Sequence, residues 1–470
     1  MYNKFVKVFL IAFIAINCVF AGTPDEWSTR TIYQLLTDRF SQTVNSSQPC
    51  SNLQSYCGGT FQGIENHLDY ILGMGFDAIW ISPVVTNTPG GYHGYWQENI
   101  YTINEYFGSE EDLLALIKAC HSRGIWVMLD VVGNHVGPVN YEYNTIVPFD
   151  SPAHYHNCTT CPEDCTINNF DDYTQVEVCR LSGLPDLDQD NAFVRSTLLN
   201  WIKNVTSFYG FDGIRIDTVP EVKAEFWTEY NQAAGVYAVG EVYNGNLTYV
   251  AEYQGPVDGV LSYPMFFTLR NVFASKQSMT QIQATFQQYQ QLFKNISYLG
   301  TFIDNHDQVR FLNEQVDVEL YKNAITYVLM AQGIPIIYYG TEQGFDGSAD
   351  PNNREPLWTT QFNQNSVLYK FIQTINEFRT QNDEVKSAEQ IQRYADNGFY
   401  AFTRGNAFIA LTNGGSVQVQ TSRVITYHPY DEGTTLCNIF WPTQDCIKVS
   451  GGQFTVYLDY GESKIYYPLS

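Results

Sequence analysis

Charged side chains stand inside stretches of the sequence that otherwise have the composition of buried β-strands. In GIRIDTV (213–219), Arg215 and Asp217 alternate with Ile214 and Ile216. Alternate side chains of a strand share a face, so the two charged residues point one way and the isoleucines the other. An arginine beside a buried carboxyl group favours its ionised form. From this strand alone, a structural ion pair is the alternative to a catalytic site.

Three further apolar runs also end in carboxylates or imidazoles. These residues are Asp130, Asn134 and His135 at the end of 125–132, Glu241 at the end of 236–242, and Asp304, His306 and Asp307 at the end of 299–307. Four strands that deliver such groups to one rim are poorly explained by structural ion pairs. The pattern therefore indicates a catalytic site.

Two carboxylates that flank a bond are the groups that glycoside hydrolysis uses. The attacking carboxylate must be ionised, and Asp217 has Arg215 beside it. The acid needs a raised pKa, and Glu241 follows VYAVG, which predicts an apolar setting without an adjacent cation. We therefore predict Asp217 as nucleophile and Glu241 as acid. Asp307 is predicted to brace the sugar or the positive charge of the transition state.

These residues need a scaffold that brings strand ends together. Eight strands are expected, at 31–40, 76–83, 125–132, 211–219, 236–242, 258–264, 299–307 and 334–342. Amphipathic helices are expected between them at 61–74, 109–123, 191–209, 278–293 and 318–332. Alternation of strand and helix predicts a parallel sheet, and eight strands close a (β/α)8 TIM barrel, which carries its chemistry at the C-terminal strand ends. A doubly wound open sheet is the alternative, but no G-x-G-x-x-G follows a strand here.

Two parts of the chain depart from this alternation. The segment from 136 to 188 has little periodicity and four cysteines, as an inserted domain would. After 384 short alternating runs predict an antiparallel β-sandwich. The predicted organisation is a signal peptide (1–21), the barrel domain A in two parts (22–135 and 189–384), an inserted domain B (136–188) and a C-terminal β domain C (385–470).

Composition limits the partners. The net charge of −24 argues against nucleic acid and anionic membranes and suits a neutral substrate. The apolar run 8–20 after Lys4 and Lys7 is typical of a secretory signal and is too short to span a bilayer. We expect a soluble, exported monomer, with a digestive vacuole or lysosome as the alternative destination. Aromatic residues make up 15% of the chain, which serves either a core or a sugar-binding cleft.

Nine cysteines remain once Cys18 leaves with the signal. Cys120 continues the apolar stripe of a helix and is predicted to be the free thiol. The other eight, Cys50, Cys57, Cys158, Cys161, Cys165, Cys179, Cys437 and Cys446, are predicted to form disulfides. A metal or redox role for CTTC (158–161) is the alternative, but an oxidising compartment favours disulfides, and proximity pairs Cys158 with Cys161. Glycosylation is predicted at the sequons of Asn45, Asn157, Asn204, Asn246 and Asn295.

Five motifs, in this order, carry a resemblance to a known family. They are DVVGNH (130–135), LPDLD (184–188), GIRIDTV (213–219), GEVY (240–243) and FIDNHD (302–307). Together they resemble the α-amylase family, glycoside hydrolase family 13, and within it the secreted fungal-type α-amylases. The resemblance covers almost the whole chain after the signal.

The resemblance implies retaining hydrolysis of α-1,4-glucan, with Asp217 as nucleophile, Glu241 as acid/base and Asp307 as transition-state stabiliser. It implies sugar binding by seven residues: Tyr95 and Trp96 in HGYW, His135, Arg215, His306, and Asp350 and Arg354 in DPNNRE. Packing at the rim is the alternative for Tyr95 and Trp96.

The resemblance also implies a structural Ca²⁺ between barrel and insert. Its ligands would be Asn134, Glu177, Asp186 and the backbone carbonyl of Glu221, hard oxygen donors that suit Ca²⁺. Ordinary hydrogen bonding by these residues is the alternative. The family further implies the pairs Cys50–Cys57 and Cys165–Cys179, and Cys437–Cys446 would staple the last domain.

One departure concerns the segment after GIRIDTV. Close relatives carry Lys-His where Pro220 and Glu221 stand here. This pair contributes to subsites beyond the cleaved bond, so an exo-acting α-glucosidase or maltogenic amylase is an alternative to the endo-amylase. A catalytically dead barrel that binds glycans or a partner subunit is a second alternative. Such barrels lose one of the three acids, and all three stand here.

Overall fold

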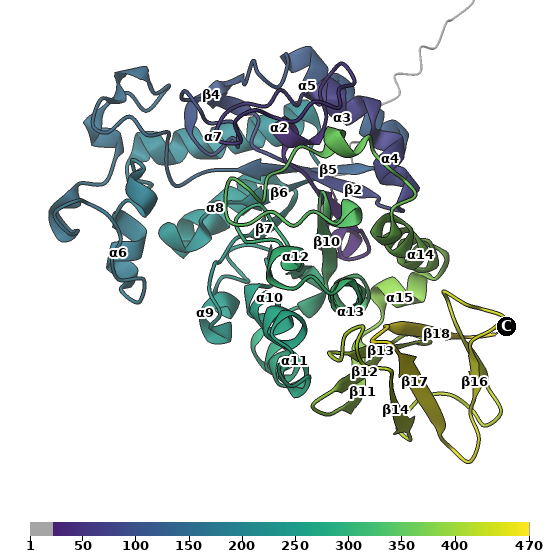
Figure 1. Ribbon diagram of the computed structural model, residues 1–470. Helices are drawn as coiled ribbons and strands as arrows, with labels where there is room; N and C mark the ends of the chain where they lie inside the picture. Colours follow the sequence, from purple (N-terminus) through teal and green to yellow (C-terminus); the bar gives the residue numbers. More distant parts are fainter. Residues whose placement is uncertain (1–21, 470) are drawn as a thin grey trace, which may run out of the picture.

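The computed structural model describes residues 22–469, so the predicted signal segment 1–21 lies outside the described residues (Figure 1). Eight parallel strands form one sheet in the order β8-β7-β6-β5-β2-β1-β10-β9. A bridge between Leu261 and Gly300 joins its two ends. The sheet is therefore a closed (β/α)8 barrel, and the predicted fold class is confirmed.

All eight barrel strands lie within the predicted stretches but are shorter. They are β1 (Ile32–Gln34), β2 (Ala78–Ile81), β5 (Trp126–Val131), β6 (Gly213–Ile216), β7 (Tyr237–Gly240), β8 (Gly259–Val260), β9 (Gly300–Thr301) and β10 (Ile334–Tyr338). The main helices around them are α3 (Phe61–Asn66), α4 (Leu68–Gly73), α5 (Glu110–Ser122), α7 (Ala192–Tyr209), α8 (Ala224–Ala234), α10 (Tyr263–Leu269), α11 (Thr280–Leu292), α13 (Val318–Met330) and α14 (Val367–Gln381). The helix predicted at 61–74 is two helices, because His67 leaves the helical conformation with φ −121° and ψ 18°.

Helix α7 shows how local sequence sets the element ends. The Asn191 side chain accepts hydrogen bonds from the backbone N–H groups of Phe193 and Val194, which caps the helix start. Gly210 ends the helix in the left-handed conformation with φ 77°. In α5, Ser109 and Asp112 form a reciprocal capping box. These caps confirm the helix boundaries predicted near these residues.

The two faces of the barrel strands enclose separate apolar clusters. Ile214 and Ile216 belong to the large cluster between strands and helices, as their alternation with Arg215 predicted. A smaller cluster fills the barrel interior. Trp27 lies in it at the N-terminal end of the strands, fully buried, with its indole N–H donating to the Asp212 carbonyl at 2.9 Å. A Cβ on Gly213 would lie 2.8 Å from this indole, so glycine there gives Trp27 its space.

The segment between β5 and α7 projects from the barrel and contains only short helices, among them α6 (Tyr173–Val178) (Figure 1). The pairs Cys50–Cys57 and Cys437–Cys446 are confirmed. The pairs Cys158–Cys161 and Cys165–Cys179 are wrong. The structure instead joins Cys158 to Cys165 and Cys161 to Cys179, with Cα–Cα distances of 5.2 and 5.7 Å.

Backbone geometry explains this exchange of partners. Cys158–Thr160 forms a 3-10 turn that ends before Cys161. Cys165 has a positive φ of 63°, so the chain turns back towards the start of this segment. The pairing of Cys158 with Cys161, which was predicted from proximity in the sequence, is therefore replaced by Cys158–Cys165. Cys120 is buried and is the free cysteine found within residues 22–469, as predicted.

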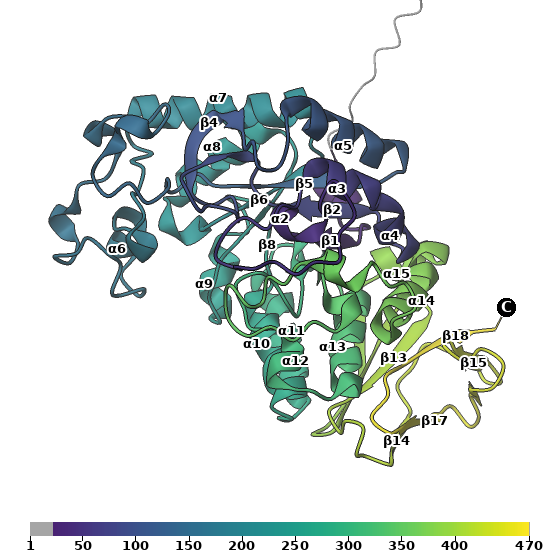
Figure 2. The same cartoon turned by 45° about the horizontal axis from the view of Figure 1, so that its top comes forward.

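The C-terminal part forms an antiparallel β structure beside α13 and α14 (Figure 2). Its strands are β11 (Gln390–Ala395), β12 (Phe399–Arg404), β13 (Ala407–Thr412), β14 (Gln420–Ile425), β15 (Thr435–Asn438), β16 (Cys446–Lys448), β17 (Phe454–Asp459) and β18 (Lys464–Pro468). They make a six-stranded sheet and the separate pair β14–β17. Asn323 on α13 donates to the Gly461 carbonyl at 2.7 Å, which ties this part to the barrel. The exact domain boundaries stay predictions.

From residue 22 to residue 469, no helix combines the length and apolar character that a bilayer crossing requires.

The position of Trp27 yields a stability prediction. Trp27→Ala should lower the free energy of unfolding by about 3–5 kcal/mol, because the cavity cannot be refilled at the closed end of the barrel. The midpoint of urea unfolding, followed by circular dichroism, measures this. Trp441 is 58% exposed in the C-terminal part, and Trp441→Ala should change stability by no more than about 0.5 kcal/mol. Equal midpoints for the two variants would contradict the role of Trp27.

Candidate active site

One buried guanidinium holds three carboxylates at the C-terminal end of the barrel strands. Arg215 on β6 lies in register with Asp130 on β5. Its Nη1 is 2.9 Å from Asp130 Oδ1 and 2.7 Å from Asp217 Oδ1, and its Nη2 is 2.8 Å from Glu241 Oε2. The Arg215 side chain is only 1% exposed. The structure therefore brings together Arg215, Asp217 and Glu241, as the sequence predicted.

Asp130 lies beneath the other two carboxylates. Its Oδ2 accepts hydrogen bonds from the Trp80 indole at 3.0 Å and the Tyr95 hydroxyl at 2.6 Å. With Arg215 on its other oxygen, Asp130 is fully engaged by protein groups. It fixes the position of Arg215 and of Tyr95.

Glu241 is held by the loop after β6 and by α10. The Thr218 backbone N–H donates to Glu241 Oε2 at 3.2 Å, and the Tyr263 hydroxyl donates to Oε1 at 3.3 Å. Thr218 reaches this position with a positive φ of 49°, an unusual conformation for a β-branched residue. The prediction that Glu241 has no cation beside it is wrong, because Arg215 arrives from the neighbouring strand rather than from nearby sequence.

Asp307 and His306 come from the segment after β9. Asp307 lies 3.5 Å from Arg354 Nη2 and 3.3 Å from His306 Nε2. The His306 ring bonds through Nδ1 to the Gln34 amide at 2.8 Å and through Nε2 to the Tyr95 hydroxyl at 2.7 Å. Arg354 also pairs with Asp350 at 3.0 Å. Asp304, by contrast, bonds Arg270 away from the cleft.

These groups line one cavity of about 660 Å³. Its predicted members are Asp217, Glu241, Asp307, Tyr95, His135, His306 and Glu221. It is further lined by Phe170, Val176, Leu181, Leu184, Thr218, Pro220, Tyr243, Asn244, Tyr249, Tyr263 and Gln308. Four residues that were predicted to bind the sugar are not among its described lining residues: Trp96, Arg215, Asp350 and Arg354. Arg354 is connected to it through Asp307, whereas the Trp96 ring packs edge-on against His93.

Burial and charge set different pKa values for the carboxyl groups. Burial raises the pKa of Glu241 to about 8; Arg215 opposes this, and the charges of Asp217 and Asp307 add to it. Burial raises the pKa of Asp217 less, to about 6, against the lowering effect of Arg215. The proton of this pair is therefore held by Glu241.

The pKa of Asp307 is lowered although burial alone would raise it. The neighbouring groups that lower this pKa when they are positively charged are His306, Arg354 and Arg215. Burial lowers the pKa of His306 to about 3, so this imidazole is neutral near pH 7. The two arginines are consequently the cations that keep Asp307 ionised.

Sequence reasoning missed three residues that position the site: Gln34, Thr218 and Tyr263. Tyr263 stands at the end of a strand run recognised in the sequence, DGVLSYP, and its hydroxyl also accepts from Asn305 at 2.9 Å. It has no charge, so the search for carboxylates and imidazoles passed over it. Gln34 ends β1 and could have been found as a polar residue at a strand end.

The predicted calcium ligands partly converge. One end of the Asn134 amide lies 2.8 Å from Asp186 Oδ1 and 3.2 Å from the Glu221 carbonyl oxygen. With its nitrogen there, the amide donates to both; with its oxygen there, three oxygens face one another, as hard cations require. Glu177 lies on α6, which packs against the turn at Val219–Glu221. Within residues 22–469 no cluster of three or more His, Cys, Asp or Glu could hold a metal, and the predicted set has only two such side chains.

Comparison with known proteins decides the family. The family model "Alpha amylase, catalytic domain" matches residues 34–417. The chain belongs to the α-amylase family. It is 38% identical to Alpha-amylase 2 of Schwanniomyces occidentalis over 94% of this chain and 91% of that relative.

Solved structures of α-amylases have the same fold. The α-amylase from Malbranchea cinnamomea is 38% identical, with a TM-score of 0.91 over 95% of this chain and 98% of that chain. The α-amylase from Geobacillus thermoleovorans, complexed with acarbose, is 28% identical, with a TM-score of 0.83 over 94% and 99%. This chain is thus an α-amylase family member, and the resemblance stated from its five motifs is confirmed.

Proposed function

We propose that this protein is a retaining endo-acting α-amylase that hydrolyses α-1,4-glucosidic bonds in starch, glycogen and related glucans. One observation carries the proposal: Asp217 and Glu241 bind the same guanidinium and line the same cavity as Asp307. Because Asp217 and Glu241 bind the same guanidinium, their carboxyl groups lie close together, and a short separation is the arrangement of retaining enzymes.

The mechanism assigns one role to each carboxyl group. Asp217 attacks the anomeric carbon while protonated Glu241 gives its proton to the glycosidic oxygen, so the bond to the leaving chain breaks. A covalent glycosyl-enzyme on Asp217 results. Glu241, now ionised, takes a proton from water, which attacks the same carbon and releases Asp217. Asp307, kept ionised by its arginines, stabilises the positive charge of both transition states.

The remaining predicted residues bind the sugar. Tyr95 presents its ring in the cavity, and His135 and His306 are neutral hydrogen-bonding groups there, since burial lowers the pKa of His135 to about 4. Arg354 pairs with both Asp307 and Asp350, so these two residues support the position of Asp307. Trp96 keeps a proposed role in binding an extended chain at the rim.

An exo-acting α-glucosidase or maltogenic amylase is the second candidate. It is favoured by Pro220 and Glu221, which line the cavity where the resemblance leads one to expect a basic pair. A carboxyl group there changes the affinity for the leaving chain, on which the choice between internal and terminal bonds depends.

We also propose a structural Ca²⁺ at Asn134, Asp186 and the Glu221 carbonyl, with Glu177 from α6. The ion would supply positive charge to these oxygens and clamp the insert to the loop that carries Thr218. His156 donates to the other carboxylate oxygen of Asp186 at 2.6 Å and so orients this ligand.

Export is proposed from the segment 1–21, with a digestive vacuole or lysosome as the alternative destination, and a monomer is the proposed state. Glycosylation is proposed at the five sequons. Four of their asparagines are exposed, while Asn295 is half-buried and caps a 3-10 turn.

Digestion of starch tests the activity. The wild type should release mixed oligosaccharides early, whereas glucose alone would favour the exo-acting candidate.

Asp217→Asn and Glu241→Gln should each lose activity by about 10³-fold or more with unchanged circular dichroism. With an aryl maltotrioside, whose leaving group needs no acid, Glu241→Gln should keep far more activity than Asp217→Asn. Asp190→Asn, an exposed carboxylate outside the cavity, is the matched control. Near-normal starch digestion by either active-site variant would refute the roles.

The pH profile of kcat/KM should be bell-shaped. Asp217 must be ionised, so activity falls as pH drops below its raised pKa of about 6; Glu241 must be protonated, so activity falls as pH rises through about 8. In Glu241→Gln acting on the aryl substrate, the alkaline limb should disappear. If that limb remained, the proton would belong to another group.

Removal of Ca²⁺ should destabilise the fold. Chelation should lower the thermal midpoint, and Ca²⁺ at about a hundredfold excess over its Kd should restore roughly 3 kcal/mol. Asp186→Asn should abolish the response, and Asp190→Asn should keep it. If chelator leaves the thermal midpoint of the wild type unchanged, the site is refuted. Full recovery of the midpoint with Mg²⁺ alone would also refute it.

A further inference from the structure

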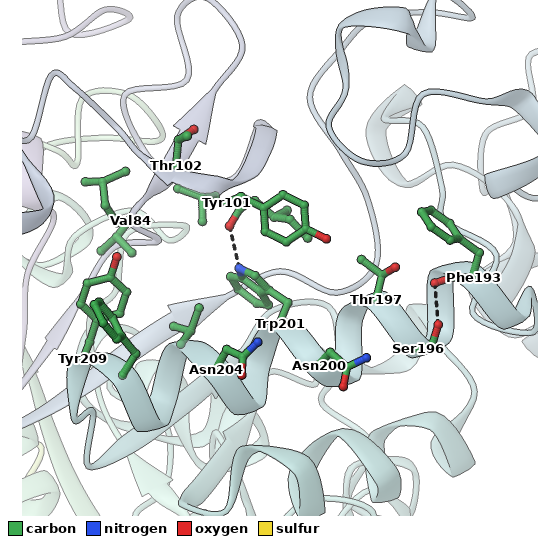
Figure 3. Close-up of a pocket in the computed structure, with 15 residues that line it drawn as sticks. Val84, Tyr101, Thr102, Phe193, Ser196, Thr197, Asn200, Trp201, Asn204 and Tyr209 are labelled. Carbon is green, nitrogen blue, oxygen red and sulfur yellow. Dashed lines mark hydrogen bonds between the residues drawn. The ribbon is translucent and has the colours of Figure 1, made fainter.

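A groove separate from the active-site cavity runs along α7, on the outside of the barrel (Figure 3). Its other wall is the hairpin of β3 (Val85–Asn87) and β4 (Gln97–Ile103). The enclosed space is about 360 Å³, within the range of sites that hold small ligands. We call it the α7 groove.

Exposed aromatic rings gather around the α7 groove. Trp201 forms its floor: it is 5% exposed, and its indole donates to the Ile100 carbonyl at 2.7 Å. Tyr101 and Phe208 are each 60% exposed, and Phe193 is 47% exposed. A single exposed ring is ordinary on a protein surface, but several rings around one concavity indicate a surface that something covers.

The acceptor residue of one sequon is itself part of the groove wall. Asn204, in the sequon Asn204-Val205-Thr206, is exposed and lines the groove. It lies three residues after Trp201 and four before Phe208, so all three share one face of α7. Figure 3 shows no hydrogen bond to the Asn204 amide from the other groove residues. A sugar attached to this amide would therefore begin beside the rings.

The chemistry of the α7 groove fits the inner sugars of an N-glycan. Among the fifteen described residues that line it, none is Asp, Glu, Lys or Arg, although these make up 16% of the chain. The inner sugars are N-acetylglucosamines, which are uncharged and have an apolar ring face, an acetamide and hydroxyl groups. The ring faces can stack on Tyr101 and Phe208. The acetamide can bond to the exposed amide of Asn200, which lies about one turn before Asn204.

We propose that the α7 groove is the docking site of the N-glycan on Asn204. The inference rests on the proposed glycosylation of this residue and is independent of the proposed activity. The docked glycan covers Tyr101 and Phe208. It strengthens the contact between α7 and the hairpin, because apolar ring surface on both walls is removed from water.

Covalent attachment favours this occupant over others. A tethered ligand is present at an effective concentration of the order of millimolar, so it fills the groove before a dilute free ligand does. A protein partner would need about 800 Å² of surface on each side, whereas the groove is a narrow concavity. A glycan at the wall would also obstruct such a partner.

Thermal unfolding of protein from two hosts tests the docking. A yeast secretory host attaches N-glycans, whereas a bacterial periplasm forms disulfides without them, and peptide mapping by mass spectrometry measures the occupancy of Asn204. In the yeast product, Asn204→Gln should lower the thermal midpoint by about 2 °C or more, because the rings become exposed. In the bacterial product the same change should leave the midpoint unchanged or slightly raised, because glutamine is a better helix former than asparagine.

Thr248→Ala is the matched control. It removes the sequon of Asn246 but keeps that asparagine, whose side chain caps α9 (Leu247–Glu252). Its thermal midpoint should not fall below that of the wild type in either host, because the lost glycan is not one that docks in the groove.

Removal of the rings should remove the effect of the glycan. In the yeast product with Tyr101→Ala and Phe208→Ala, the further change Asn204→Gln should leave the midpoint unchanged, so the ring changes and the sequon change are not additive. Peptide N-glycosidase should release the Asn204 glycan from this native ring variant at least about tenfold faster than from the native wild type, because the rings make the contacts. The rate of release at Asn246 should be the same in both proteins.

Three results would overturn the proposal. If Asn204 carries no glycan in the yeast product, its glycosylation and the docking both fail. If it carries one and Asn204→Gln leaves the midpoint of the yeast product unchanged, the docking alone fails. A wild-type dimer in light scattering that the ring variant converts to a monomer would make the groove a protein interface instead.

Discussion

The structure depends on one buried interaction, the guanidinium of Arg215 between Asp130, Asp217 and Glu241. A charge with 1% exposure is costly unless it is paired, and here two nitrogen atoms are paired with three carboxylates from three strands. The register that sets Asp130 opposite Arg215 is thus fixed both by backbone hydrogen bonds and by charge. Loss of Arg215 would leave three buried carboxylates without a cation, whereas loss of one carboxylate leaves the guanidinium paired with two others. Arg215 therefore stabilises the barrel and its cleft together.

The same arrangement explains where the proton is. Three carboxylates around Arg215, with Asp307 nearby, contain more negative charge than the guanidinium can balance. Asp307 forms its own ion pair with Arg354, and Asp130 accepts three hydrogen bonds. The excess is removed most easily by protonating Glu241, whose pKa is raised furthest of the carboxyl groups on Arg215. A general acid beside an ionised nucleophile follows from burial and charge balance alone.

The features predicted correctly from the sequence are those that depend on periodicity. The alternation of Arg215 and Asp217 with two isoleucines has period two, which determines the strand face without any knowledge of neighbours. Contacts between distant segments could not be predicted this way. The cation beside Glu241 comes from another strand, Tyr263 acts through an uncharged hydroxyl, and Cys158 meets Cys165 only because of a left-handed residue. Each of these depends on a tertiary approach that no local pattern encodes.

The cleft and the α7 groove use opposite electrostatics for what we propose are two carbohydrates, a substrate glucan and the protein's own N-glycan. In the cleft, buried carboxylates provide chemistry, and neutral imidazoles bind beside them. The groove has no charge among its described lining residues, so it has rings and amides to bind with and no acid or base to react with. A net charge of −24 disfavours the binding of anionic polymers but not of an uncharged glucan. A groove that is itself neutral can hold an uncharged glycan without disturbing the proton balance around Arg215, because it places no new charge near the barrel mouth.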